Sequence, residues 1–195
     1  KMPVVLDPRV GNGLLSYLVG AINGASIARR SSFLLDKLED QIFASGITII
    51  DDPHRQRGLR SRSFDGEGLP THKRNLVEDG RLTGWLMTSA DARQLGLEPT
   101  GHASRSGSGA PSATASNVHL APGNLPPEDL MADIGEGLYV TMLYGQGINM
   151  VTGDYSRGAS GRRIRGGELA EAVEEITIAS TLPEMFLSMT PANDL

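Results

Sequence analysis

The sequence predicts an α+β domain with a largely antiparallel β-sheet and a few helices. Short apolar or β-branched runs bounded by turn residues recur along the whole chain, which is the pattern of strands joined by hairpins. Strands and helices do not alternate in the order that a parallel βαβ sheet requires. Glycine accounts for 24 of the 195 residues, which indicates many tight turns.

In the first quarter of the chain, a helix is predicted between residues 14 and 28. Apolar side chains recur there at helical spacing, and Asn12 is the expected N-cap. Small residues at every fourth position, Gly20, Gly24 and Ala28, allow another backbone to approach this helix closely. The other elements expected in this region are a strand at 2–6, a helical or mixed segment at 33–44 and a buried strand at 47–50.

The middle of the chain combines a hairpin with a low-complexity segment. A β-hairpin is predicted over 70–88, because Asp79-Gly80 suits a tight primed turn. Residues 100–116 are rich in Gly, Ser and Ala and have little surface to bury, so we expect a loop that is poorly ordered near 104–114. The remaining elements expected here are a helix at 89–95, capped by Ser89 or Asp91, and a strand at 117–120.

The last third of the chain is predicted to hold most of the sheet. A helix opens at Pro126 with acidic residues in its first turn. Glycines then separate a series of strand patterns. The predicted elements are a helix at 126–133, strands at 137–143, 148–156, 161–173 and 174–180, and a final helix at 182–188.

Composition excludes several classes of function. The net charge of −5 argues against a nucleic-acid binder. The absence of cysteine excludes disulfides, thiol catalysis and thiolate metal ligands. No signal-peptide pattern is present, and the longest apolar stretch is too short and too polar for a membrane span. We therefore expect a cytoplasmic protein with no membrane partner.

Four histidines are the first candidates for a metal site. His54, His72, His102 and His119 lack the spacing of ligands on one helix and fall in loops or hairpins. They are interpreted as exposed or locally hydrogen-bonded, with a cluster formed by distant segments as the alternative. His102, beside the low-complexity segment, is the best candidate among them.

Two acidic steps, Asp51-Asp52 and Asp65-Gly66-Glu67, permit two interpretations. Paired carboxylates can hold a hard cation or transfer protons, whereas Asp and Glu at strand ends commonly cap turns. The second interpretation is favoured. No serine stands in a nucleophile-elbow pattern, and no glycine-rich turn has the context of a phosphate loop.

Basic residues cluster in two places, which suggests either a nucleic-acid or a protein contact. Acidic residues are interleaved with them and no stacking aromatics accompany them, so a solvated sheet edge is favoured. An arginine-rich edge also suits a protein–protein or peptide contact. The clustered residues are Arg55, Arg57, Arg60, Arg62, Lys73, Arg74, Arg162, Arg163 and Arg165.

Five stretches together resemble the TldD/PmbA family, whose members are also called modulators of DNA gyrase. They are GAINGASIARRSSFL (20–34), ITIIDDP (47–53), LVEDGRLTGWLM (76–87), GHASRSGSGAPSATASNVHL (101–120) and GDYSRGASGRRIRGGELAEAVEEITIAS (153–180). The resemblance implies that residues 1–195 are a single, C-terminal, metallopeptidase-like domain. An N-terminal domain and a last strand are expected outside this sequence.

In the metallopeptidase branch of that family, the helix that matches 14–28 carries a His-Glu-x-x-x-His zinc motif. The corresponding window here is 16–21, with Ser16 and Tyr17 at the first His and Glu positions and Ala21 at the second His position. The catalytic branch also uses a cysteine ligand, and this chain has none. The resemblance therefore implies the PmbA branch, also called TldE, with no catalytic and no metal-binding residues.

The resemblance further implies a zinc-free, non-catalytic subunit of a peptidase complex that processes or matures peptides. The expected partners are a zinc-bearing TldD-type subunit or a second copy of this chain, together with a peptide substrate in a shared cavity or on a sheet edge. The expected peptide-binding loop contains His102, Ser104, Arg105 and Ser106. The alternative is a regulatory protein that binds DNA gyrase or a gyrase-directed toxin.

Overall fold

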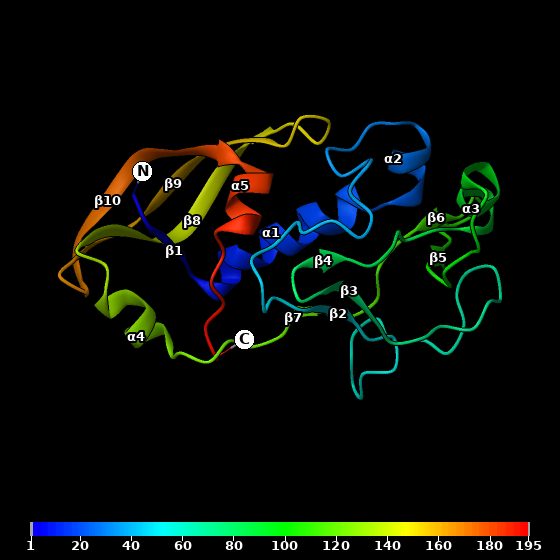
Figure 1. Ribbon diagram of the computed structural model, residues 1–195, viewed down its shortest axis with the longest axis horizontal. Coiled ribbons are helices and arrows are strands. Elements are labelled where there is room, and N and C mark those ends of the chain that lie inside the picture. The colour runs from blue at the N-terminus through cyan, green and yellow to red at the C-terminus, as the bar shows by residue number, and fades with distance from the viewer. Residues whose placement is uncertain (1, 195) are drawn as a thin grey trace.

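The computed structural model describes residues 2–194, which form two four-stranded sheets and one two-stranded sheet. Figure 1 shows the longest strands at one end of the molecule and the shorter strands at the other, with helices α1 and α5 between them. Only one strand pair within this range is parallel. The structure confirms the predicted α+β class with largely antiparallel sheets.

The first sheet consists of β1 (Val4–Leu6), β8 (Glu136–Ile148), β9 (Asp154–Arg165) and β10 (Glu168–Thr181), in the order β1-β8-β9-β10. The series of shorter strands predicted for this region is wrong, because three long strands run through the glycines. A Cβ on Gly161 would collide with the carbonyl oxygen of Tyr139 on β8. Glycine here permits close contact between strands and does not mark a turn.

The second sheet consists of β4 (Arg81–Leu82), β3 (Arg74–Glu78), β2 (Ile49–Asp51) and β7 (Val118–Leu120), in the order β4-β3-β2-β7. Asp79 and Gly80 join β3 to β4 with positive φ angles of 47° and 78°. Such angles at both central residues belong to the primed turn that the sequence predicts. The hairpin is confirmed, but its strands cover 74–82 and not the whole of 70–88.

Five helices complete the described part of the chain: α1 (Pro8–Ala21), α2 (Gly24–Ala28), α3 (Ser89–Leu95), α4 (Pro127–Ala132) and α5 (Leu182–Leu187). The main core forms where α1 meets the second sheet and α5, around side chains such as Leu18, Ile49, Val77 and Phe186. Within residues 2–194, none of the helices has the length and apolar character that crossing a membrane requires.

The single helix predicted over 14–28 is wrong, because the chain forms two helices that meet at Asn23. Helix α1 begins earlier than expected: Asp7, and not Asn12, is its N-cap, and Pro8 follows in the first turn. Asn23 then caps α2 by accepting a hydrogen bond from the Ala25 amide. The capping side chain competes with helix continuation, which ends α1.

The Asn23 cap interrupts the predicted row of small residues, Gly20, Gly24 and Ala28. The predicted close approach of another backbone segment nevertheless occurs at Gly24. The Gly24 amide donates to the carbonyl oxygen of Leu86 at 2.7 Å. A Cβ at Gly24 would lie 2.9 Å from that oxygen and from the side chains of Met87 and Asp91. Gly24 therefore lets α2 pack directly against the segment that precedes α3.

Three local predictions in the middle of the chain need correction. Residues 33–44 form turns and no regular helix. Thr88 caps α3, and Asp91 completes a capping box with it. The low-complexity segment is only partly a loop, because β5 (Ala103–Ser104) pairs with β6 (Ser112–Ala113) and its ends are buried. Ala103 and Ala113 are buried in the hairpin while residues 105–110 between them are exposed, a division that composition alone does not indicate.

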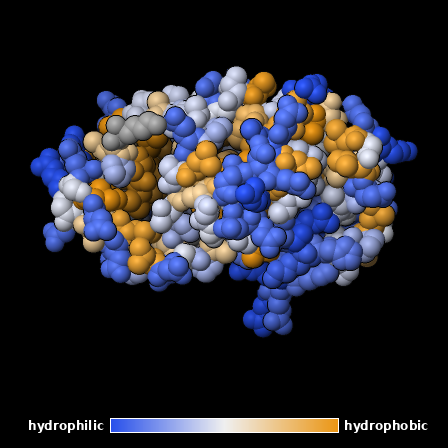
Figure 2. All heavy atoms as spheres, viewed as in Figure 1, coloured by the Kyte–Doolittle hydropathy of each residue, from blue (hydrophilic) through white to orange (hydrophobic). Residues whose placement is uncertain are grey.

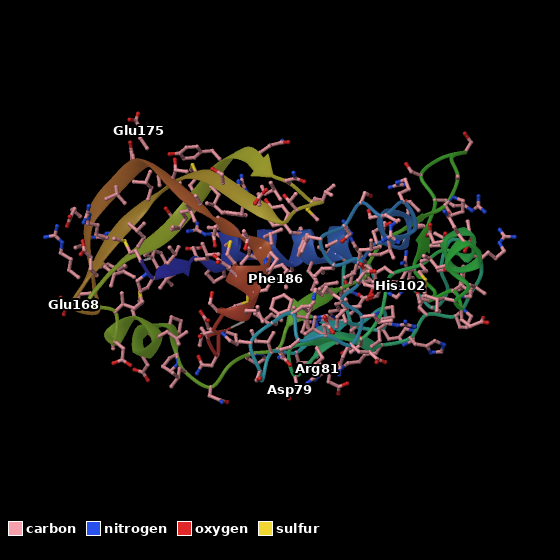
Figure 3. The ribbon with its side chains drawn as sticks, turned by 45° about the horizontal axis from the view of Figure 1, so that its top comes forward. Asp79, Arg81, His102, Glu168, Glu175 and Phe186 are labelled. Atoms are coloured by element: carbon pink, nitrogen blue, oxygen red, sulfur yellow. The ribbon has the colours of Figure 1, made fainter. Side chains whose placement is uncertain are left out.

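The outer edge of β10 is poorly suited to strand addition. Its pairing with β9 is interrupted by two register shifts, and Glu175 beside the second has a positive φ of 54°. Figure 3 shows Glu168 and Glu175 pointing outward at this end of the molecule. Bulges and charges are the usual protection of an exposed edge strand, so the β10 edge is not suited to pairing with a peptide strand.

Candidate functional site

Helix α1 carries the window that the resemblance aligns with a zinc motif. Its N-terminus is fixed by Asp7, whose carboxylate accepts from Arg9 Nε at 2.8 Å and from the Tyr139 hydroxyl at 3.1 Å. The hydrogen bonds from Arg9 hold the pKa of Asp7 well below its usual range. Leu14 and Leu18, on the same helix face as Ala21, are buried in the core. The window is therefore held on a rigid support.

The three motif positions do not converge on a common point. Ser16 is exposed and its hydroxyl donates back to the Asn12 carbonyl at 3.3 Å. The Tyr17 hydroxyl accepts a hydrogen bond from Arg157 Nη1 on β9 at 3.2 Å. Ala21 is buried in the core with only 1% of its surface exposed.

These residues do not fit a zinc ion. Zinc needs three or four nitrogen, sulfur or oxygen ligands around one point, and a methyl group supplies none. A zinc ion at this position would bring two positive charges close to the Arg157 guanidinium, which is hydrogen-bonded to Tyr17. The like charges would repel each other. Between residues 2 and 194, no group of three or more His, Cys, Asp and Glu side chains could hold a metal ion.

His102 belongs to a buried polar cluster and not to an exposed loop. Its Nε2 lies 3.0 Å from Asp51 Oδ2 and its Nδ1 lies 2.8 Å from Thr100 Oγ1. Only 3% of His102 is exposed, and Figure 3 shows it inside the half of the molecule that holds the second sheet. The prediction that His102 itself contacts a peptide is therefore not supported by this geometry.

The other carboxylate oxygen of Asp51 fixes the segment after β6. Oδ1 accepts from the Ser116 amide at 2.9 Å and from the Ser116 hydroxyl at 2.5 Å. Burial raises the pKa of Asp51, but the hydrogen bonds from His102 and Ser116 outweigh it and hold the pKa below its ordinary value. Asp51 thus ties β2 to both ends of the β5–β6 hairpin.

Asp65 has a similar structural role, as the sequence interpretation of the acidic steps favoured. Its carboxylate accepts hydrogen bonds from three backbone amides, those of Glu67, Leu69 and Ala103. The two acidic steps therefore organise loops and strands. The remaining histidines stay apart, with His54 bonded to Thr71 and His119 near the Asn117 carbonyl.

A groove opens beside the hairpin that Asp51 and Asp65 hold. Its volume is about 450 Å³, and it is lined by Arg60, Ser61, Arg62, Ser104, Thr114 and Ala115. Of the four residues predicted as a peptide-binding loop, Ser104 lies in this lining. Arg105 and Ser106 are exposed beyond it, and Arg105 Nε donates to the Gly66 carbonyl.

The arginine wall of this groove is positioned by Asn117. The Asn117 side-chain oxygen accepts from the Arg60 amide at 3.1 Å, and its Nδ2 donates to the Ser61 hydroxyl at 3.0 Å. Arg62 crosses to the other wall, where Nη2 donates to the Thr114 carbonyl at 3.1 Å. The groove is therefore a fixed feature of the fold, built by segments about fifty residues apart in sequence.

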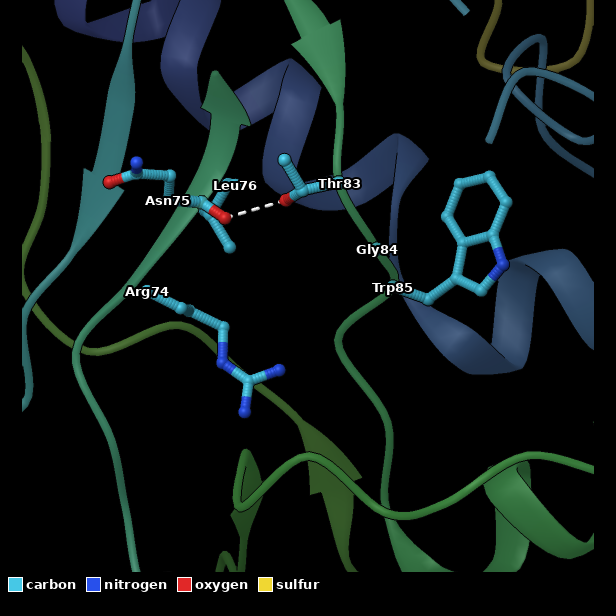
Figure 4. A pocket seen from close by; sticks show the side chains of 6 residues that line it. All are labelled: Arg74, Asn75, Leu76, Thr83, Gly84 and Trp85. Atoms are coloured by element: carbon cyan, nitrogen blue, oxygen red, sulfur yellow. Dashed lines mark hydrogen bonds between the residues drawn. The ribbon is translucent and has the colours of Figure 1, made fainter. Parts of the chain in front are cut away.

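A smaller cavity of about 210 Å³ lies where β3 and the chain after β4 separate. Figure 4 shows the Arg74 guanidinium in this opening and the Trp85 indole turned away from it. A hydrogen bond of 2.6 Å from Thr83 Oγ1 to the Asn75 carbonyl joins the two segments beside the cavity. Burial lowers the pKa of Arg74, and Asp51 opposes that change. The cavity has less than half the volume of the groove beside β5.

Comparison with known proteins decides the family. The sequence model of the PmbA/TldA metallopeptidase C-terminal domain matches residues 1–195. The chain belongs to the PmbA/TldD family. Metalloprotease PmbA of Escherichia coli O157:H7 is 44% identical over 196 residues, which cover the whole chain and 42% of that protein.

Two crystal structures from the same family have this fold. One, from Bacteroides thetaiotaomicron and named as a candidate modulator of DNA gyrase, has a TM-score of 0.89 at 29% identity and covers 100% of this chain and 42% of its own. TldE from Thermococcus kodakarensis has a TM-score of 0.88 at 28% identity, covering 97% and 44%. The chain spans about two fifths of the length of these PmbA/TldD relatives.

Sequence reasoning missed most of the groove and the partners of His102. Arg60 and Arg62 had been noted only as a basic cluster, and Thr114 lies in a segment interpreted as a loop. A local signal did exist for the groove: arginines at alternate positions in a turn-rich segment that contains no large buried side chain. Nothing local could pair His102 with Asp51, which lies 51 residues earlier.

Proposed function

We propose that this chain is the zinc-free, non-catalytic subunit of a cytoplasmic PmbA/TldD-type peptidase complex for peptide proteolysis and maturation. The zinc that cleaves the peptide belongs to a TldD-type partner, and this chain shapes the channel that holds the substrate. The observation that supports this proposal most directly is the motif window on α1. Ser16, Tyr17 and Ala21 stand at the positions of the zinc motif, and the helix remains anchored in the core.

The rest of the fold supports a role in binding and orientation. The Asn117 side-chain oxygen accepts from the Arg60 amide and the Asp51 carboxylate accepts from the Ser116 amide, and these hydrogen bonds support both walls of the groove beside β5. A wall that is rigid before binding loses little conformational entropy when it positions a flexible substrate. The chain's own residues then bind and orient the peptide and exclude water from it, without taking part in proton transfer.

A reconstitution assay tests this function. The full-length protein alone should not cleave a fluorogenic peptide, and addition of a TldD-type subunit should produce cleavage that exceeds the activity of that subunit alone. A TldD-type subunit with its motif glutamate changed to glutamine should abolish the activity of the mixture. Cleavage by this protein alone, resistant to the same change in the partner, would contradict the proposal.

We expect the isolated protein to contain far less than one zinc ion per chain after dialysis. The hydroxyls of Ser16 and Tyr17 and the methyl group of Ala21 do not form a zinc site, and Arg157 repels a cation. Elemental analysis by mass spectrometry measures the ratio, with a TldD-type subunit as the positive control. A stoichiometric ion that survives dialysis would show that distant residues form a site after all.

The names of relatives suggest the regulatory alternative, in which the protein acts on DNA gyrase. The small polar and basic side chains that line the groove contain no specific feature that favours gyrase or a gyrase-directed toxin over a peptide. A gyrase supercoiling assay with the purified protein separates the two functions. Inhibition without any TldD-type subunit would favour the alternative over the peptidase complex.

A further inference from the structure

The groove beside β5 contains positive charge that the protein does not neutralise. Arg60 and Arg62 line it, and Arg55, Arg57 and Arg105 on the flanking segments are exposed. No member of this set forms an ion pair with another residue in the 2–194 range. The set is Arg55, Arg57, Arg60, Arg62 and Arg105.

The carboxylates on neighbouring segments are already engaged elsewhere. Asp65 accepts three backbone amides, and Asp51 accepts Ser116 and His102. Asp52 accepts the His54 amide and lies 3.5 Å from Lys73, while Glu67 accepts the Ser89 amide and hydroxyl. Within residues 2–194, none of these carboxylates therefore forms an ion pair with an arginine of the groove.

Arg62 is the most constrained of these cations. Its Nη2 is held by the Thr114 carbonyl, which is a neutral acceptor, and its Nε is buried without a hydrogen-bond partner. A guanidinium that has lost water and has no anionic partner gains strongly from a carboxylate at its accessible edge. Arg60, which is exposed on the same wall, can bind the second oxygen of such a carboxylate.

The shape of the groove favours a peptide over a nucleic acid. Its lining contains small polar side chains, Ser61, Ser104 and Thr114, and no aromatic ring on which a base could stack. Its volume of about 450 Å³ matches a short segment of chain and not a duplex groove. The net charge of −5 also opposes extended contact with phosphates.

We propose that this groove is a carboxylate-binding subsite, in which Arg60 and Arg62 hold an acidic residue or the C-terminal carboxylate of a peptide. The inference rests on the proposed function only in taking the ligand to be a peptide. It adds a substrate class, namely peptides that carry a negative charge. The charged group enters the groove, and the rest of the peptide extends toward the substrate channel of the complex.

Fluorescence anisotropy with labelled peptides tests the subsite on the full-length protein alone. Three probes share one short Gly/Ser/Ala sequence: one has two adjacent central glutamates and an amidated C-terminus, one has glutamines in their place, and one has the glutamines with a free C-terminal carboxylate. A single-stranded DNA oligonucleotide of similar length is the fourth probe. Low and high salt are compared.

The glutamate probe, the free-carboxylate probe or both should bind more tightly than the amidated glutamine probe, which distinguishes the two sources of charge. Arg60→Ala and Arg62→Lys should each weaken that binding about tenfold, the loss expected for a charge-assisted hydrogen bond. Arg57→Gln is the matched control, because Arg57 is exposed in the same loop but does not line the groove. Arg60→Ala removes an exposed side chain, so it leaves the fold intact.

Equal affinity for all three peptides, or equal loss in Arg57→Gln and Arg60→Ala, would overturn the subsite. Tighter binding of the oligonucleotide than of any peptide would overturn it in favour of a nucleic-acid surface. These measurements need no partner subunit. A failed reconstitution assay with intact carboxylate binding would therefore reject the proposed function alone, and the reverse result would reject the subsite alone.

Discussion

Asp51→Ala is expected to lower the free energy of unfolding by about 3–5 kcal/mol, because several buried donors lose their acceptor and each costs about 1–3 kcal/mol when left unsatisfied. Asp51 is 1% exposed, and its carboxylate serves the Ser116 amide, the Ser116 hydroxyl and His102 Nε2. Alanine leaves these buried donors without acceptors and leaves Arg74 without the nearby negative charge. The hairpin wall of the groove should loosen with it.

Asp51→Asn is the informative comparison, because it keeps the shape and one acceptor oxygen. If the oxygen faces Ser116, the amide group can donate to His102 Nε2, provided that His102 carries its proton on Nδ1 and donates to Thr100. The cost should then fall to about 1–2 kcal/mol, mainly for the lost charge. Urea denaturation followed by circular dichroism measures both values.

The pH dependence of stability has a definite sign for Asp51. Its folded-state pKa is lowered, so the stabilisation is complete above the unfolded pKa of about 4 and is lost as the pH falls through the folded value. Asp51→Asn should therefore flatten the acid limb of the stability curve. Asp52→Ala is the matched control: Asp52 is the next residue, with a partly exposed side chain and an ion pair to Lys73, and should cost about 1 kcal/mol or less. Equal losses for Asp51→Ala and Asp52→Ala would show that the buried cluster is not the cause.

Phe186→Ala is expected to cost about 3–5 kcal/mol, the usual range for a large buried aromatic side chain. The Phe186 ring is fully buried and stacks on Phe43, with ring centroids 4.3 Å apart and an interplanar angle of 15°. It also lies 6.3 Å from Phe33. Figure 3 shows Phe186 where α5 meets the rest of the core, between the ends of the molecule.

Phe186 also lies at the connection between the two four-stranded sheets. Helix α5 follows β10 of the first sheet, and its Phe186 carbonyl accepts the amide of Ala44, just before the second sheet begins. Loss of the ring should therefore weaken the connection between the two sheets as well as leave a cavity. Leu187→Ala, at the next and 50% exposed position, should change stability by about 0.5 kcal/mol or less. A loss for Leu187→Ala as large as that for Phe186→Ala would contradict this account.

Local features of the fold were predictable where one short stretch contains the whole signal. The Asp79-Gly80 turn requires positive φ angles that the structure shows, and the helices at 89–95 and 126–133 begin within a residue or two of the predicted positions. The prediction of one helix over 14–28 was wrong because the Asn23 side chain caps a new helix and so ends the first one. The sequence around it gives no measure of that competition.

The sequence by itself determined the fold class, the family resemblance and the absence of ligand side chains at positions 16, 17 and 21, because each depends on residue identity or local periodicity. The tertiary structure alone decided that His102 is buried against Asp51, that Ser116 completes the pair from 65 residues away, and that Arg60 and Arg62 face Thr114 across a groove. Such pairs form only when distant strands pack in one register. The free energy that selects this register comes from burying the shared core around α1, and no local pattern of residues encodes it.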